Sequence, residues 1–138
     1  MNKAEIMAFI KANPNCCVAS VEGNKPHTRV LTMYRADDNG IILQSYKWKG
    51  LYKQLVKNPE VEICFCDTNK FVEVRVSGRM EIVEDPALTK EIVEARPFVK
   101  PVLEQMGYDA IAVYRLKNGK ATSWAMTDQL EPNTYVDL

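Results

Sequence analysis

Apolar and polar residues alternate along most of this chain, and this period predicts short β-strands. The longest case is Phe71–Val83, in which Val72, Val74 and Val76 are separated by charged and hydroxyl residues. Side chains of a strand point alternately to its two faces, so one face of this strand is expected to be buried and the other polar. The expected strands are Cys16–Glu22, His27–Ala36, Ile41–Ser45, Val61–Cys66, Phe71–Val83, Ala110–Leu116 and Ala121–Met126.

Helical spacing of apolar residues is limited to short segments. Asn2 and Glu5 are spaced as in a capping box, and the helix that they begin is expected to stop before Pro14. Asp85 followed by Pro86 is the pattern of an N-cap and a first helical residue. The later helices are expected at Lys49–Asn58, at Asp85–Ala95 and, interrupted by Pro97 and Pro101, up to Gly107.

Turn residues between the strands indicate how the strands are connected. Gly, Asn and Asp gather at residues 22–25, 37–40 and 117–120, which favours hairpins and therefore antiparallel pairing. Gly78 interrupts the longest strand and indicates a bulge or bend. The expected fold is a mainly β single domain over residues 1–138, a closed or nearly closed barrel with flanking helices, and an open sandwich is the alternative.

The composition excludes several classes of function. Hydrophobic residues make up 46% and charged residues 26% of the chain, as in ordinary globular proteins. Lys plus Arg equals Asp plus Glu at 18 each, so no net field attracts nucleic acid or an anionic membrane. No segment has about 18 consecutive apolar residues, and residues 1–11 lack the apolar core of a signal peptide. We therefore expect a cytoplasmic protein with no nucleic-acid or membrane partner.

Residues that commonly bind metals or act as catalysts are few. His27 is the only histidine, and no pair of Cys-x-x-Cys motifs accompanies it, so no metal site is expected. Cys16, Cys17, Cys64 and Cys66 lie in apolar runs and are expected to be reduced thiols in the core. The glycines are too scattered for a dinucleotide-binding phosphate loop. No catalytic residue is identified from the sequence.

The stretch Gln44–Leu51 combines the features of an anion site. A strand ends and a helix begins there, and Lys47 and Lys49 lie beside the expected helix start. The free N–H groups and positive dipole at the start of a helix favour a phosphate, and the lysines add positive charge. A solvated helix start with surface lysines is the alternative interpretation of the same residues.

Four segments in a fixed order resemble a known family. They are Pro26–Leu31, Gln44–Lys49, Asn58–Val61 and Val72–Arg79. In order and spacing they are similar to the pyridoxamine 5′-phosphate oxidase-like FMN-binding split barrels, over about residues 1–85. The resemblance implies a split β-barrel homodimer that holds two FMN molecules at the subunit interface.

The resemblance also implies which residues bind the cofactor. In that family, the strand that carries the arginine and the strand before the short helix form the floor of the flavin site. Basic residues at the start of that helix hold the FMN phosphate. An aromatic residue from the C-terminal hairpin covers the flavin of the partner subunit, and Trp124 is the candidate here, with a core or interface tryptophan as the alternative. The implied cofactor-binding residues are Arg29, Val30, Leu31, Thr32, Gln44, Ser45, Lys47, Lys49 and Trp124.

Several positions depart from the oxidase pattern. Lys47, Trp48 and Lys49 stand where the oxidase has Ser-Arg-Lys, and Glu73 stands where it has a flavin-contacting glutamine. No Arg-x-His motif follows Arg115 to grip a vitamin phosphate, so pyridoxamine phosphate is not the expected substrate. The expected function is an FMN-dependent oxidoreductase acting on an unidentified small molecule such as a nitro compound or quinone. A noncatalytic protein that stores or senses flavin, heme or deazaflavin is the alternative.

Overall fold

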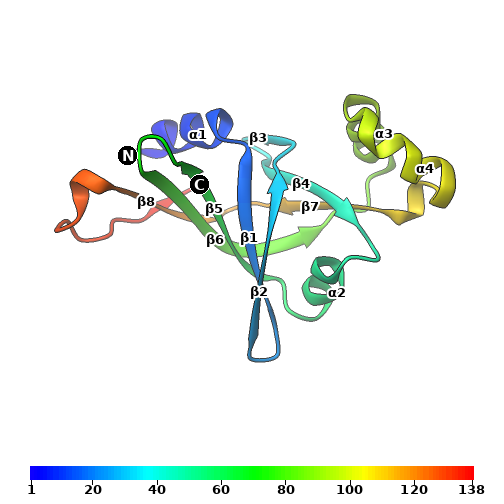
Figure 1. Cartoon of the computed structure of the whole chain (residues 1–138), viewed down its shortest axis with the longest axis horizontal. Helices are drawn as coiled ribbons and strands as arrows, with labels where there is room; N and C mark the ends of the chain where they lie inside the picture. Colours follow the sequence, from blue (N-terminus) through cyan, green and yellow to red (C-terminus); the bar gives the residue numbers. More distant parts are fainter.

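A curled antiparallel sheet forms the centre of the molecule, which we describe from a computed structural model of residues 1–138 (Figure 1). Its strands are β1 (Asn15–Glu22), β2 (Lys25–Thr32), β3 (Arg35–Asp37), β4 (Gly40–Tyr46), β5 (Glu60–Asp67), β6 (Val72–Ile82), β7 (Ile111–Leu116), β8 (Lys120–Ala125) and β9 (Val136–Asp137). The helices are α1 (Lys3–Ala12), α2 (Gly50–Lys57), α3 (Pro86–Ala95) and α4 (Lys100–Met106). The predicted mainly β antiparallel fold with flanking helices is confirmed, and no helix is both long and apolar enough to cross a bilayer.

The strands are hydrogen-bonded in the order β2-β1-β5-β6-β7-β4-β3, and β8 joins through β6. The long strand β6 changes partner along its length, pairing with β8 over Val72–Ser77 and with β7 over Met80–Ile82. The predicted hairpin at residues 117–120 is therefore wrong, because the two strands that this turn joins pair with different parts of β6 and not with each other. Gly78 lies between these two parts of β6. The residues of β6 around it pair one to one with those of β5, so Gly78 marks a bend of the strand rather than a bulge. A Cβ at Gly78 would lie 2.8 Å from Cδ1 of Leu116, which explains why the bend carries no side chain.

The predicted single strand His27–Ala36 is wrong, because it is interrupted at Met33 and Tyr34. The N–H of Met33 donates to Pro14 O at 2.7 Å, and the N–H of Tyr34 donates to Ile42 O at 2.9 Å. The strands on either side, β2 and β3, are the two ends of the hydrogen-bonded path. One short stretch of chain therefore joins both ends of the sheet and curls it into a half-barrel.

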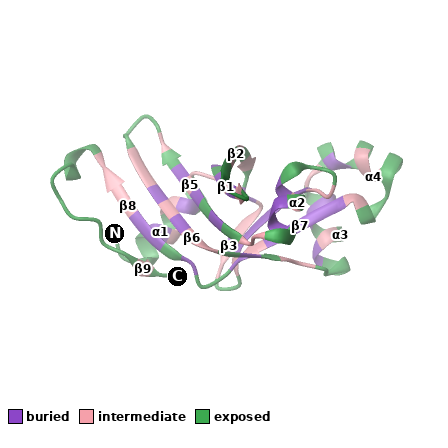
Figure 2. Ribbon diagram, turned by 90° about the horizontal axis from the view of Figure 1, so that it is seen from below, coloured by how far each residue is buried: buried purple, intermediate pink, exposed green.

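Two apolar cores lie on opposite faces of the part of the sheet formed by β4 and β7. The larger core fills the inside of the half-barrel, with Phe65 and Tyr114 as its largest fully buried side chains. The smaller core lies between β4, β7 and the helix α3, where Ile42 and Val113 meet Ile92. Because both faces are covered, β7 is buried over almost its whole length (Figure 2).

The helix ends follow the sequence signals. Asn2 Oδ1 accepts from the N–H of Glu5 at 2.9 Å, and the N–H of Asn2 donates to Glu5 Oε2 at 2.7 Å, so the predicted capping box is formed. The Asp85 carboxylate caps α3, which begins at Pro86 as expected. Figure 1 shows α3 and α4 at one end of the long axis and the two chain termini toward the other.

The prediction that all four cysteines lie in the core is wrong for three of them. Only Cys16 is buried, while Cys17 and Cys66 are exposed and Cys64 is half-buried; all four are free thiols. The reason is strand alternation, because neighbours of an inward residue such as Cys16 or Phe65 must point outward. Burial raises the pKa of Cys16 to about 12, and burial together with the charge of Glu73 raises the pKa of Cys64 to about 11.

Candidate functional site

The predicted flavin residues of β2 point to both faces of the strand. Arg29 and Leu31 turn inward and are half-buried, whereas Val30 and Thr32 turn outward and are exposed, Val30 to 68%. A ligand on one side of β2 therefore meets two of these side chains and only the backbone of the other two. The family resemblance implied that all four line the flavin.

The Arg29 guanidinium lies in a polar network beneath α2. Its Nη1 donates to Ser20 Oγ at 2.8 Å and to Val18 O at 3.1 Å, and its Nη2 donates to Gln54 Oε1 at 2.8 Å. Ser20 also donates to Gln54 Oε1, and both of these side chains are buried. The network ties β1 and β2 to the middle of α2, so Arg29 helps to set the position of that helix.

The start of α2 has the properties of an anion site. Lys49 occupies the N-cap position, no side chain caps the helix, and its first turn contains no acidic residue. The first backbone N–H groups of the helix therefore have no side-chain acceptor, and they point to the same side as the positive end of the helix dipole. Phosphate or another oxyanion suits this arrangement.

The structure directs Lys47 toward the connection between β6 and α3. Its Nζ lies 3.7 Å from Glu84 Oε1, and its backbone N–H donates to Ala110 O at 2.9 Å. Lys47 lines a cavity of about 520 Å³ whose wall also carries Asp85 and Asp109. Its charge is therefore partly matched by carboxylates within the chain, unlike the charge of Lys49. Their joint contact with a phosphate stays a prediction.

Gln44 and Ser45 are both buried at the end of β4, and they face opposite sides of the strand. Gln44 Oε1 accepts from Arg96 Nη1 at 3.4 Å, and Arg96 Nη2 donates to Thr32 O at 2.9 Å. Arg96 directly follows α3, and through these two hydrogen bonds it connects the end of β2 with the end of β4. The sequence did not identify it, because a single arginine after a helix has no motif of its own.

Aromatic rings surround this bridge. The Arg96 guanidinium lies 5.4 Å from the ring centre of Tyr34 and 5.8 Å from that of Phe98. Tyr46 and Trp48, on the chain that leads into α2, stack with their ring centres 4.5 Å apart. The corner between β2, β4 and the start of α2 therefore combines cations with flat apolar surfaces, which suits a planar ligand that bears negative charge.

Trp124 lies on β8 directly opposite Glu73 of β6, so the two side chains share one face of the sheet. We call this the outer face. It also carries Cys17 of β1, which lies opposite Val30 of β2 on one side and opposite Cys64 of β5 on the other. Glu73 Oε1 lies 3.4 Å from Nε of Arg75, which stands two residues away on the same face. The carboxylate that replaces the glutamine of the oxidase pattern thus has a cation beside it.

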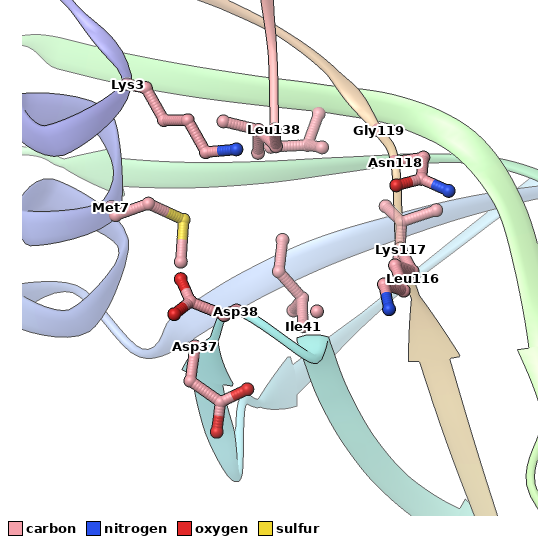
Figure 3. Close-up of a pocket in the computed structure, with 12 residues that line it drawn as sticks. Lys3, Met7, Asp37, Asp38, Ile41, Leu116, Lys117, Asn118, Gly119 and Leu138 are labelled. Carbon is pink, nitrogen blue, oxygen red and sulfur yellow. The ribbon is translucent and has the colours of Figure 1, made fainter.

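A separate cavity of about 320 Å³ lies at the α1 end of the molecule (Figure 3). Lys3 and Met7 of α1 face the turn that carries Asp37 and Asp38, and Leu138 closes another side. Its charged residues include both signs, so the cavity has no clear preference for an anion or a cation. None of the predicted flavin residues lines it.

Comparison with models of known protein families shows to which family the chain belongs. A model of the family described as pyridoxamine 5′-phosphate oxidase matches residues 3–123. The chain belongs to the pyridoxamine 5′-phosphate oxidase family. The match extends well past the first 85 residues that carry the sequence resemblance and includes α2, Arg96 and most of β8. A search of curated proteins finds no match.

Solved structures related to this family have the same fold. A NimC/NimA family protein from Clostridium acetobutylicum has a TM-score of 0.79 at 21% identity, over 98% of this chain and 92% of that one. General stress protein 26 from Bacillus anthracis has a TM-score of 0.71 at 16% identity, over 99% and 98%. An FMN-binding protein related to pyridoxamine 5′-phosphate oxidase, from Nostoc punctiforme, has a TM-score of 0.67 at 13% identity, over 96% and 88%. The predicted split-barrel fold is thereby confirmed.

Proposed function

We propose that this protein binds FMN at the corner formed by β2, β4 and the start of α2, and that it acts as an oxidoreductase on a small molecule. Membership of the pyridoxamine 5′-phosphate oxidase family supports the proposal, as does the FMN-binding relative from Nostoc punctiforme. Bound FMN supplies the electron-transfer chemistry, and the protein supplies binding, orientation and charge.

The observation that carries the proposal is the uncapped start of α2. Lys49 stands at the N-cap with no acidic residue in the turn that follows, so no internal carboxylate competes for the free N–H groups. A phosphate monoester carries close to two negative charges at neutral pH, which matches a helix start with a lysine beside it. The residues at this corner therefore fit the phosphate end of FMN.

A second element of the proposal is a homodimer formed through the outer face. Val30 is 68% exposed there, the thiol of Cys17 is exposed beside it, and that of Cys66 is exposed farther along the same face on β5. Covering apolar surface contributes about 25 cal/mol per Å² removed from water, which favours association of two such faces. In the dimer we expect Trp124 of one subunit to lie over the flavin site of the other.

Lys49→Ala is expected to weaken FMN binding about tenfold to a hundredfold, because a charge-assisted hydrogen bond to phosphate contributes about 1.5–3 kcal/mol. Lys47→Ala is expected to weaken binding in the same direction if Nζ leaves Glu84 for the phosphate. Calorimetric titration with FMN measures both. Riboflavin, which lacks the phosphate, should be affected far less by either substitution.

Lys57→Ala is the matched control, since Lys57 lies in the last turn of α2, at the opposite end of the helix dipole. It should leave both affinities unchanged. Equal losses for FMN and riboflavin, or equal effects of Lys49→Ala and Lys57→Ala, would place the phosphate elsewhere. Absence of saturable FMN binding to the unmodified protein would remove the cofactor proposal itself.

Val30→Asp is expected to convert the dimer to a monomer, because it places a charge in the centre of the proposed interface, where desolvation of an unpaired carboxylate costs several kcal/mol. Light scattering should give twice the 15.7 kDa chain mass for the unmodified protein and the single mass for the variant. Asn24→Asp, in the exposed turn between β1 and β2, adds a carboxylate outside the paired part of the outer face and is the control. A monomeric mass for the unmodified protein at all concentrations would contradict the shared-site arrangement.

The oxidoreductase activity has its own test. The FMN-loaded protein is mixed with a reduced nicotinamide and an organic acceptor such as a nitro compound or quinone, and loss of the nicotinamide absorbance is followed. We expect steady-state turnover. A flavin that stays oxidised under these conditions would instead indicate storage or sensing.

A further inference from the structure

Arg96 is a half-buried cation for which the chain provides no carboxylate partner. The contacts of its guanidinium are the amide oxygen of Gln44, the backbone oxygen of Thr32 and the faces of two aromatic rings. It takes part in none of the ion pairs of the structure. Burial lowers its pKa, and the groups that act in the opposite direction are the hydroxyls of Tyr34 and Tyr46 rather than a carboxylate.

Arg35 provides a useful contrast, because it lies over the same Tyr34 ring at 5.8 Å. Its guanidinium is paired with Asp37 at 2.9 Å and with Glu91 at 3.1 Å. The protein has therefore neutralised one of the two arginines beside Tyr34 and left the other without a counter-ion. Removing a cation from water without an anion beside it is costly, so a residue of this kind is poised to accept an anionic ligand.

We propose that Arg96 binds the carboxylate of a small aromatic acid, which is the substrate class of the adjoining site. The inference rests on the proposed function, because Thr32 and Gln44, which Arg96 contacts, belong to the predicted flavin site. A guanidinium binds a carboxylate with two parallel N–H groups, and only one N–H group on each of Nη1 and Nη2 has a partner within the chain. The remaining N–H groups are left for the ligand.

The aromatic part of the proposed ligand follows from the rings around Arg96. Phe98 is 65% exposed although it lies 5.8 Å from the guanidinium, so its ring offers a free apolar face next to the cation. Tyr46 lies close enough to Arg96 to influence its pKa, and it stacks on Trp48, which is 41% exposed. Planar rings bind such faces by offset stacking.

The test compares p-nitrobenzoate with p-nitrobenzamide, which share the ring and the nitro group but differ in charge. Calorimetric titration of the FMN-loaded protein, with no reductant present, measures binding apart from turnover. We expect p-nitrobenzoate to bind about tenfold to a hundredfold more tightly than the amide, as charge-assisted hydrogen bonds to one guanidinium predict. Equal affinities for the two compounds in the unmodified protein would overturn the inference before any variant is made.

Arg96→Gln is expected to abolish that preference while leaving the affinity for p-nitrobenzamide within about twofold, since it removes the charge but keeps a hydrogen-bond donor. Arg35→Gln is the matched control and should keep the full preference. Arg96→Lys, which keeps the positive charge but loses the paired N–H groups of the guanidinium, should keep part of the preference for p-nitrobenzoate. An unchanged preference in Arg96→Gln would show that the anion binds elsewhere, and a preference lost equally in Arg35→Gln would assign the effect to packing around Tyr34.

The inference and the proposed function fail in different ways. Protein that binds no FMN but still prefers p-nitrobenzoate through Arg96 would refute the cofactor proposal and retain the anion subsite. Protein that binds FMN with the expected dependence on Lys49 but does not distinguish the two nitro compounds would refute the subsite and retain the cofactor proposal.

Discussion

Gly40→Ala is expected to lower the free energy of unfolding by about 2–5 kcal/mol, the sum of backbone strain and a steric clash. Gly40 begins β4 with a φ of +109°, a conformation that residues with a side chain rarely adopt. A Cβ there would lie 2.6 Å from the backbone oxygen of Leu116, the residue that ends β7. A backbone atom inside a paired strand has little room to retreat. Urea denaturation followed by circular dichroism measures the loss.

Gly23→Ala separates the two causes. Gly23 also has a positive φ, +57°, but no atom lies within 4 Å of the position of its Cβ. Only the strain remains there, and we expect a loss of about 1–2 kcal/mol. If the two variants lost the same stability, the contact with Leu116 would not contribute, and the assignment of the larger loss to a steric clash would be refuted.

Arg29→Ala is expected to lower the free energy of unfolding by about 2–4 kcal/mol, because it removes charge-assisted hydrogen bonds and the packing of the aliphatic stem. The guanidinium bonds Ser20, Gln54 and the backbone of Val18 in a partly buried network. Gln54 belongs to α2, so the loss should also loosen that helix. We therefore expect weaker binding of FMN and of riboflavin together, which differs from the phosphate-specific effect of Lys49→Ala.

Arg79→Ala is the control for the loss of an arginine as such. Arg79 forms an ion pair with Glu60 at 2.7 Å, but its side chain is 72% exposed. Exposed pairs contribute only about 0–1 kcal/mol, so stability and ligand binding should change little. Denaturation midpoints for the two variants that agree within error would contradict a structural role for the Arg29 network.

The elements of this fold were largely readable from local patterns. The capping residues Asn2 and Asp85 marked the starts of α1 and α3, and the turns at residues 22–25 and 37–40 marked the antiparallel pairs β1–β2 and β3–β4. The turn at residues 117–120 did not mark a pair, because β7 and β8 bind different parts of the distant strand β6. These features depend on residues close in sequence, and their hydrogen bonds form within a few positions of the chain. The break at Met33 and Tyr34 was missed, because it depends on acceptors that distant segments supply.

In the candidate site, too, some residues could be selected from local sequence patterns and others only from tertiary contacts. Lys49 became a candidate from the sequence because a lysine at the start of a predicted helix has a local chemical meaning. Arg96 was not, since it reaches Gln44 across 52 positions and Thr32 across 64 positions of the sequence. The outward position of Cys17, Cys64 and Cys66 followed from alternation, but the apolar character of their runs misleadingly indicated a core.

The sequence by itself determined the strand periods, the helix caps, the turns and, through the order of its motifs, the family. Those properties depend on short-range geometry and on residue types at fixed spacing. Only the tertiary structure decided which face of each strand is covered, which charges are paired and which cation is left without a counter-ion. Burial and ion pairing depend on the segments that the curled sheet brings together, so Lys47 has Glu84 beside it while Arg96 forms no ion pair with a carboxylate.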